Sequence, residues 1–321
     1  MKTRLARTVA CTAIAATALG CAPPIRSTAI HPPAPAELSA FWEAVDPATR
    51  DLRWGVGGRA LAPDPDAEYE ILERDLRGFS TTFEVRDPAG RRWSVKIGPE
   101  AQSEVTASRV VWAVGYRQVP AYYLPRWRWR WTERSQQGSE GPARFRPKVD
   151  AFDVDGTWSW HQNPFVGTRS YRGLLALMMI LNSTDLKDDN NALVRDRRGR
   201  GNRVSYVVKD LGATFGTTGS HNPARNDVDE FERHAFVRGV TREGRVRFAF
   251  RGLHRELLAD ITPADVAWTC ERLARLTDEQ WQDAFRAAGQ PPEIAARFIA
   301  RLRAKIDEGL ALRRRTGEDG R

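Results

Sequence analysis

The sequence predicts an α+β protein with two lobes: a small β-rich N-lobe with one helix, and a larger, mainly helical C-lobe. Two observations support this fold class. Extended runs surround a single helix in residues 69–160, whereas helical patterns dominate residues 170–312 and are interrupted by one hairpin. The chain has 321 residues, of which 41% are hydrophobic and 28% charged, and these proportions exclude collagen-like and wholly disordered proteins.

Residues 1–21 are typical of an export signal. Lys2, Arg4 and Arg7 precede an apolar stretch that is too short to span a bilayer comfortably. Its end, Ala18-Leu19-Gly20-Cys21, is similar to a bacterial lipobox, although Leu usually stands where Ala18 does. We therefore expect an exported lipoprotein that Cys21 anchors to a membrane, in the periplasm or at the outer membrane or cell surface. A soluble secreted protein is the alternative.

The cysteines and the charge indicate how the fold is held together and which partners to expect. Cys11 lies in the signal and Cys21 would be acylated, so only Cys270 remains and no internal disulfide can form. Cys270 falls in an amphipathic helix and is expected to be buried. The net charge of +9 is spread along the chain rather than gathered in a tail. We expect a monomer that does not bind nucleic acid.

The expected organisation follows the chain in order. It comprises a signal peptide at 1–21, a Pro-rich tether with a short helix at 22–45, the N-lobe at 46–165, the C-lobe at 166–315 and a disordered tail at 316–321. In the N-lobe we expect strands at 69–72, 80–86 and 92–97, a helix at 100–116, and further strands in 117–160 around a disordered-looking loop at 135–142.

One of these later strands has an unusual composition. Arg126-Trp-Arg-Trp-Arg-Trp131 alternates with period two, which predicts a half-buried strand with its tryptophans inward. A cationic–aromatic strip that touches lipid headgroups is the alternative. In the C-lobe we expect two strands around 195–203, a polar loop at 212–226, and helices at 170–181, 263–275, 277–288 and 292–312.

Three segments contain residues suited to phosphate chemistry. The first is the strand Trp93-Ser-Val-Lys96-Ile-Gly, followed by the helix with Glu104. The second, Asp185-Leu-Lys187-Asp-Asp-Asn190-Asn191, directly follows an apolar helix. The third, Lys209-Asp210-Leu211-Gly212, ends a strand. Only six residues of the chain are lysines, so their presence in all three segments is informative.

In this order and context the segments resemble the protein-kinase-like fold. The resemblance implies that Lys96, held by Glu104 or alternatively by Glu100, fixes the phosphates of ATP or another nucleotide. It implies that Asn190 and Asp210 hold Mg²⁺.

The same resemblance implies a catalytic role for two residues of the second segment. Asp185 would act as the base that accepts the proton of a hydroxyl acceptor on a protein, sugar or lipid, and Lys187 would stabilise the transferring phosphate.

The sequence also departs from typical protein kinases. Ser183-Thr184-Asp185 replaces His-Arg-Asp, no Ala-Pro-Glu follows Asp210, and no G-x-G-x-x-G precedes Lys96. Only Gly78 and Ser80 with its two threonine neighbours could cover phosphates. The pattern is therefore similar to the atypical branches, such as HipA-like, phosphoinositide-kinase-like or secretory-pathway kinases.

These observations leave three functional hypotheses. The first is an envelope-located phosphotransferase, the second a kinase-fold binding or scaffold lipoprotein without turnover, and the third a purely structural envelope lipoprotein. A bacterial envelope contains little ATP, which weighs against the first. His161, His221, His234 and His254 are scattered without metal-ligand spacing, so surface or capping roles are expected for them.

Overall fold

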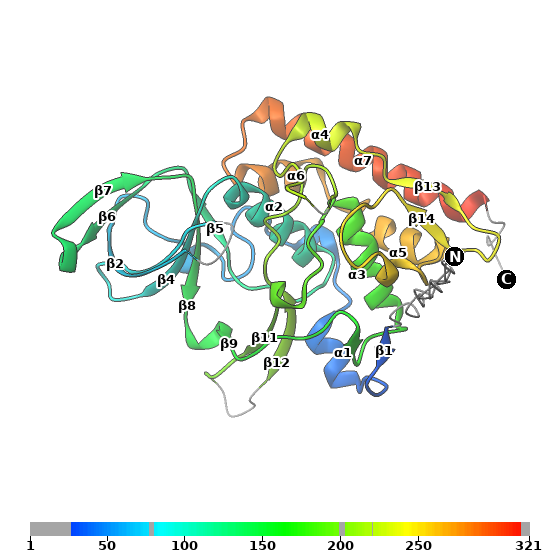
Figure 1. Ribbon diagram of the computed structural model, residues 1–321, viewed down its shortest axis with the longest axis horizontal. Helices are drawn as coiled ribbons and strands as arrows, with labels where there is room; N and C mark the ends of the chain where they lie inside the picture. The colour runs from blue at the N-terminus through cyan, green and yellow to red at the C-terminus, as the bar shows by residue number, and fades with distance from the viewer. Residues whose placement is uncertain (1–26, 77–79, 199–202, 220, 316–321) are drawn as a thin grey trace, which may run out of the picture.

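A computed structural model of the chain describes residues 27–76, 80–198, 203–219 and 221–315. The predicted signal peptide with Cys21 and the predicted tail at 316–321 lie outside these residues. Within them the predicted fold class is confirmed: a sheet with one packed helix forms one lobe, and a larger, mainly helical lobe lies beside it (Figure 1).

The small lobe is built on a curled seven-stranded sheet. Its spatial order is β5-β8-β4-β3-β2-β6-β7, and all neighbours are antiparallel except β2 and β6. The strands are β2 (Glu68–Asp75), β3 (Thr82–Arg86), β4 (Arg92–Ile97), β5 (Tyr122–Leu124), β6 (Trp127–Trp131), β7 (Gln136–Glu140) and β8 (Ala143–Lys148). Alternate residues such as Val85, Trp93 and Val95 are fully buried in the lobe's core, as period-two patterning requires.

The Trp-Arg strip is β6, and its predicted half-buried character is confirmed. Trp127 and Trp131 are buried, whereas Arg128 and Arg130 are exposed. The prediction of a disordered-looking loop at 135–142 was wrong, because Gln136–Glu140 forms β7 and pairs with β6. The polar sequence of β7 has no apolar alternation to reveal a strand. Gly138 lets β7 approach β6 closely, since a Cβ there would lie 2.8 Å from the Trp129 ring.

One helix of the small lobe faces the other lobe. This helix, α2 (Glu100–Ala113), packs against β4, β5 and β8 on one side and against α6 (Asp278–Arg286) on the other. The chain then leaves the sheet through β8 and crosses to β9 (Asp153–Val154), as Figure 1 shows. Residues of the sheet and residues of the helical lobe therefore meet at α2 and at the end of β8.

The larger lobe encloses the main hydrophobic core. Its helices are α3 (Arg169–Ile180), α4 (Val228–Arg233), α5 (Pro263–Leu273), α6 and α7 (Pro292–Arg315), and α5 packs between α3 and α7. Cys270 is fully buried there, as predicted. The predicted hairpin is β11 (Asn191–Arg195) with β12 (Val204–Val208), and β9 pairs with β11. A second hairpin, β13 (Val237–Val240) with β14 (Val246–Phe248), was not predicted.

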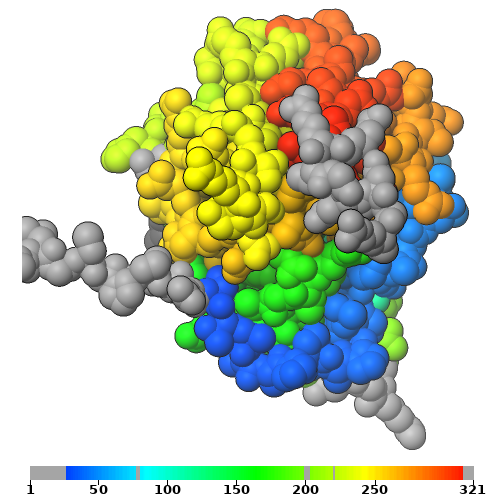
Figure 2. Space-filling view, turned by 90° about the vertical axis from the view of Figure 1, so that its right-hand side faces the viewer, coloured from blue at the N-terminus to red at the C-terminus, as the bar shows by residue number. Residues whose placement is uncertain are grey.

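The N-terminal segment, residues 27–55, packs along the helical lobe. Its strand β1 (Thr28–Ala29) pairs with β10 (Gln162–Asn163), so part of the predicted tether is hydrogen-bonded. Its helix α1 (Pro35–Phe41) places the Phe41 ring in a stack on Phe165, with 4.3 Å between centroids. Figure 2 faces this lobe and shows the blue N-terminal segment beside the green and yellow segments.

Among the described residues, no helix has the length and the apolar character that crossing a bilayer requires.

Candidate functional site

Lys96 lies at the centre of a buried group of charged side chains between the lobes. Its ammonium Nζ is 2.9 Å and 3.0 Å from the two carboxylate oxygens of Asp210, a residue 114 positions later in the chain. The same Nζ is 2.9 Å from Glu100 Oε2 and 3.5 Å from Glu104 Oε2, both on α2. Three segments that the sequence singled out separately, β4, α2 and the end of β12, therefore meet at one ammonium group.

The pleat of β4 explains why Lys96 faces this group. Trp93 and Val95 point into the sheet core, so Lys96 points to the opposite side, where α2 packs. Its cross-strand partner on β8 is Arg144, and Arg146 is opposite Ser94 two residues away. Because residues two apart share a face, β8 presents two arginines to the same side of the sheet as Lys96.

Both of the glutamates considered as partners of Lys96 contact it. Glu100 is the nearer, and it also accepts a hydrogen bond from Ser80 and pairs with Arg225 at 3.2 Å. Glu104 is fully buried, and its Oε1 lies 2.8 Å from Arg144 Nε and 2.7 Å from an Arg146 amino nitrogen. The two arginines hold Glu104 in the interior, where a carboxylate needs charged partners.

Asp210 is held by the residues that follow it. The Gly212 N–H donates to Asp210 Oδ1 at 3.2 Å, and Ser103 of α2 donates to the Gly212 carbonyl at 2.7 Å. Gly212 passes so close to α2 that an added Cβ would lie 2.7 Å from Glu100 Cβ. A residue without a side chain is thus needed for the Asp-Leu-Gly segment to reach Lys96.

The segment 185–190 is joined directly to Asp210. The carbonyl oxygen of Asn190 accepts the backbone N–H groups of Lys209 and Asp210 at 2.7 and 3.0 Å. The Asn190 side chain donates through Nδ2 to the Asp185 carbonyl at 2.8 Å. Lys187 Nζ lies 3.1 Å from Asp185 Oδ1, and both side chains reach solvent. A chain of contacts therefore connects Asp185 to Lys96 through Asn190 and Asp210.

The electrostatics of the site favour its charged forms. Burial alone would lower the pKa of Lys96, but Glu104, Asp210 and Glu100 outweigh it and raise the pKa above its usual 10.5. Burial would likewise raise the pKa of Asp210, yet Lys96 and the Gly212 N–H lower it from 3.8 to about 2. Burial and Arg146 lower the pKa of Lys209. Lys96 and Asp210 are therefore both ionised near neutral pH.

A cavity of about 550 Å³ lies beside this charged group, a size typical of small-molecule sites. The residues that surround it come from the outer part of β4, from β8 and the crossing after it, and from the end of β12, and they include Ser94, Arg146, Lys148, Phe152 and Lys209. Arg146 links the cavity to the site, because it donates to the Lys209 carbonyl at 3.0 Å and pairs with Glu104.

Sequence reasoning identified most of these residues but not all. Glu104 and Asp210 both contact Lys96. Hydrogen bonds of Asn190 connect the loop with Asp185 and Lys187 to Asp210. Gly78 lies outside the described residues. Ser80 is buried against Glu100. The arginines at 144, 146 and 225 were not predicted. Arg144 and Arg146 are two residues apart on the strand that pairs with β4, and this alternation could have placed them on the face of Lys96. No sequence pattern could have placed Arg225 next to Glu100, because only folding brings the two together.

Comparisons with known proteins find solved structures that resemble this chain but no match by sequence. No protein-family model and no curated protein matches this chain. The solved structures that match include the crystal structure of CtkA, a proinflammatory kinase of Helicobacter pylori, at 10% identity over 80% of this chain and 98% of that chain, with a TM-score of 0.44. A likeness at this level assigns no residue and no activity. The architecture itself agrees with the predicted two-lobed kinase-like fold, with Lys96 on β4, its carboxylates on α2 and Asp210 after the β11–β12 hairpin.

Proposed function

We propose that the protein is a nucleotide-dependent phosphotransferase of an atypical kinase type. The observation that carries this proposal is the meeting of Lys96 with Asp210, Glu100 and Glu104, because these residues come from three separate elements. Arg146, which pairs with Glu104, and Lys209, which precedes Asp210, line an adjoining cavity. A strand lysine held by helix carboxylates is suited to fixing nucleotide phosphates. The proposed nucleotide is ATP or a similar compound.

The balance of charges at the site supports an anionic ligand. Four cations contact its carboxylates, namely Lys96, Arg144, Arg146 and Arg225, and they exceed the three carboxylates by one charge. Lys209 borders the adjoining cavity as well. A polyphosphate placed there would meet ammonium and guanidinium groups, which are the usual phosphate donors of proteins.

Asp210 and Asn190 fit the binding of Mg²⁺. Both offer hard oxygen ligands, and the Asn190 Nδ2 is used by the Asp185 carbonyl, so its amide oxygen is the end left to ligate a cation. When bound, Mg²⁺ would neutralise phosphate charge. Lys96 would then exchange part of its contact with Asp210 for the phosphates, while Glu100 and Glu104 keep its position.

Asp185 is the proposed general base. Its side chain reaches solvent, so an acceptor hydroxyl can approach it and donate a proton to its carboxylate. Lys187, 3.1 Å from Asp185, would stabilise the transferring phosphate. The acceptor is proposed to be a hydroxyl group of a protein, sugar or lipid.

The proposed location is the bacterial envelope, through the export signal and a lipid on Cys21, and the protein is proposed to act as a monomer. The low ATP content of that compartment gives weight to a second candidate, a kinase-fold scaffold that binds a nucleotide without turnover. The direct Lys96–Asp210 ion pair favours this candidate, because Lys96 already neutralises the carboxylate that would bind Mg²⁺.

Binding can be tested by thermal shift with ATP and Mg²⁺. A ligand at one hundred times its Kd stabilises the folded state by about 2.7 kcal/mol. We expect the wild-type melting temperature to rise with ATP concentration, and Lys96→Met to remove the rise. Arg130→Met, which removes an exposed cation on β6, should keep it. No shift of the wild type at millimolar ATP would contradict both the enzyme and the nucleotide-binding scaffold.

Catalysis is tested separately by ATP hydrolysis or γ-phosphate transfer. For an enzyme, Asp185→Asn should lower turnover at least a hundredfold while it retains the ATP-dependent thermal shift, because the substitution removes the base but not the phosphate-binding cations. Equal background turnover in wild type and Asp185→Asn, with the thermal shift intact in both, would favour the scaffold.

A further inference from the structure

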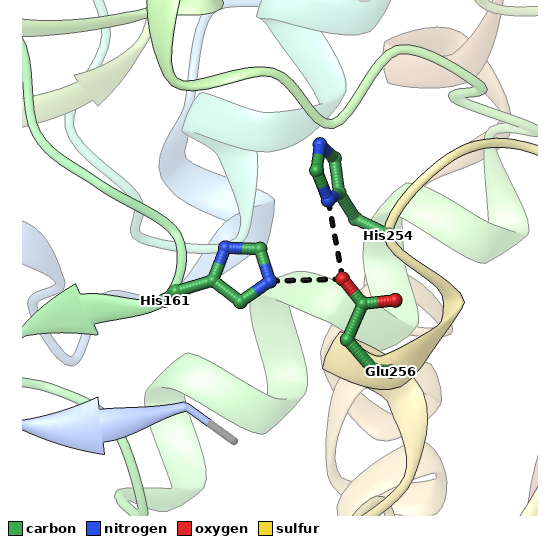
Figure 3. A group of neighbouring side chains, drawn as sticks. All are labelled: His161, His254 and Glu256. Carbon is green, nitrogen blue, oxygen red and sulfur yellow. Dashed lines mark hydrogen bonds and ion pairs between the residues drawn. The ribbon is translucent and has the colours of Figure 1, made fainter. Parts of the chain in front are cut away.

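Two histidines and a glutamate from separate segments converge away from the site described above. His161 lies just before β10, whereas His254 and Glu256 lie at the short helical turn 255–258, after β14. Figure 3 shows both imidazole rings directed at the same carboxylate. One nitrogen of each ring and an oxygen of Glu256 all lie within 4.8 Å of one another. We propose that these three side chains bind a divalent transition-metal ion, with Zn²⁺ as the best match.

The distances suit a small cation. His161 Nε2 is 2.9 Å and His254 Nδ1 is 3.1 Å from the same Glu256 oxygen, Oε1. In a tetrahedral zinc site with bonds of about 2.0–2.1 Å, neighbouring ligand atoms lie about 3.4 Å apart. The two histidine–glutamate distances need to lengthen by only a few tenths of an ångström to reach this value, and the two ring nitrogens lie within 4.8 Å of each other. The ring nitrogens that now contact Glu256 would become the ligands.

The ligand set and its exposure indicate an open site. Two imidazoles and one carboxylate are ligands that zinc takes readily, and three protein ligands leave a fourth position for water. The side chains of His161, Glu256 and His254 are 15%, 29% and 37% exposed, so an ion can enter. Glu256 also borders a cavity of about 740 Å³, although neither histidine lines it.

The backbone supports the same placement. His254 has a φ of 61°, in the left-handed region that residues other than glycine rarely adopt. Such conformations are concentrated at ligand-binding positions, where the surrounding structure holds them. Here the conformation starts the turn that brings His254 and Glu256 to one side, where they face His161.

A metal ion at this place would connect distant parts of the chain. The His161 carbonyl accepts the N–H of Thr28 at 2.8 Å, next to the β1–β10 pair. Ion binding would therefore fasten the segment that holds the N-terminal strand to the turn after β14. We expect Zn²⁺ to stabilise the folded protein, and this expectation does not depend on the nucleotide site.

The experiment uses the untagged chain, stripped with a chelator and titrated with ZnCl₂ alone by calorimetry and thermal shift. Wild type should bind one equivalent and melt at a higher temperature. His254→Gln and Glu256→Gln should each weaken binding at least tenfold. His31→Gln, which removes an exposed histidine of the N-terminal segment, should bind as the wild type does. Equal zinc affinity in all four proteins, or no binding by the wild type, would overturn the proposal.

Cobalt gives a test that needs no variant. Co²⁺ in a four-coordinate nitrogen–oxygen site absorbs visible light strongly, so the wild-type chain should become coloured and lose the colour when one equivalent of Zn²⁺ displaces the ion. If His254→Gln fails to fold, this spectrum still decides the question. A wild-type spectrum identical to that of free aqueous Co²⁺ would refute the site.

Discussion

At the residue scale, the site between the lobes depends on burying opposite charges together. Lys96 and Glu104 are nearly inaccessible to water, and a buried charge is tolerated only when charged or polar partners surround it. Lys96 contacts three carboxylates, and Glu104 contacts three cations. Removing any one member disturbs this balance of buried charges, so single substitutions here should have large effects.

Asp210 should make stability depend on acidity in a defined pH range. Its pKa is lowered from 3.8 to about 2, so its ionised form contributes stability that is complete above 3.8 and lost as the pH falls toward 2. Urea unfolding of wild type and Asp210→Asn between pH 2 and 6 measures this contribution. The advantage of the wild type should be constant above about pH 5 and shrink below pH 4.

The Lys96→Met background provides the control for this acid effect. Without the ammonium that lowers the pKa of Asp210, the substitution Asp210→Asn should cost less stability, and its pH dependence below 4 should weaken. An undiminished pH dependence in that background would show that the ion pair is not its source.

Gly212 is expected to tolerate no side chain. In Gly212→Ala the new Cβ would lie 2.7 Å from Glu100 Cβ, so the Asp-Leu-Gly segment or the start of α2 must move. Overpacking of this kind costs about 1–3 kcal/mol, measured here as the loss in free energy of unfolding in urea. Gly219→Ala is the control, since its nearest atom would be 3.7 Å away. Equal losses in the two variants would contradict the close approach to α2.

At the scale of elements, patterning predicted the regular structure well. The strand at 92–97 and the starts of the helices α2 and α7 agree with the structure, because apolar periodicity and flanking Gly or Pro residues mark them. β7 was missed because its polar residues lie at a sheet edge, where burial imposes no pattern. Arg225 and the His161–His254–Glu256 group could not be predicted, because only tertiary folding brings them to their partners.

Lys305 of α7 links two helices and should also make stability pH-dependent. It is fully buried and donates to the Ile180 carbonyl at 2.9 Å and to Asn182 Oδ1 at 2.8 Å, at the C-terminal end of α3. Burial and then Arg301 lower its pKa well below 10.5. The Lys305 ammonium group therefore loses its proton more easily in the folded protein than in the unfolded chain. As the pH increases toward 10.5, the free energy of unfolding of the wild type should rise relative to that of Lys305→Met.

Urea unfolding of the two proteins at pH 7, 8, 9 and 10 measures this difference. Arg242→Met removes an exposed cation that is not a lysine, so its difference from wild type should stay constant over the same range. A Lys305→Met difference that is equally constant would mean that Lys305 is not desolvated in the folded protein.

At the scale of the whole molecule, the N-terminal segment connects both lobes. Trp42 Nε1 donates to the Val114 carbonyl at 2.9 Å, at the end of α2. Gln280 of α6 donates to the carbonyls of Pro47 and Arg50 at 2.9 and 2.7 Å. Because α2 packs on the sheet of the small lobe and α6 lies in the helical lobe, this segment ties the two lobes together. We therefore expect the lobes to unfold as one cooperative unit.

Phe41→Ala tests this coupling. The Phe41 ring is buried between Phe165, Tyr116 and Trp158, and truncating such a ring costs about 3–5 kcal/mol. Native-state hydrogen exchange, followed by mass spectrometry, should show that the slowest amides of β4 and of α5 lose protection by the same amount, since both exchange through global unfolding. Leu76→Ala, at an exposed position, should change neither. A loss confined to α5 would mean that the sheet is stable without the N-terminal segment, and the lobes would then be independent folding units.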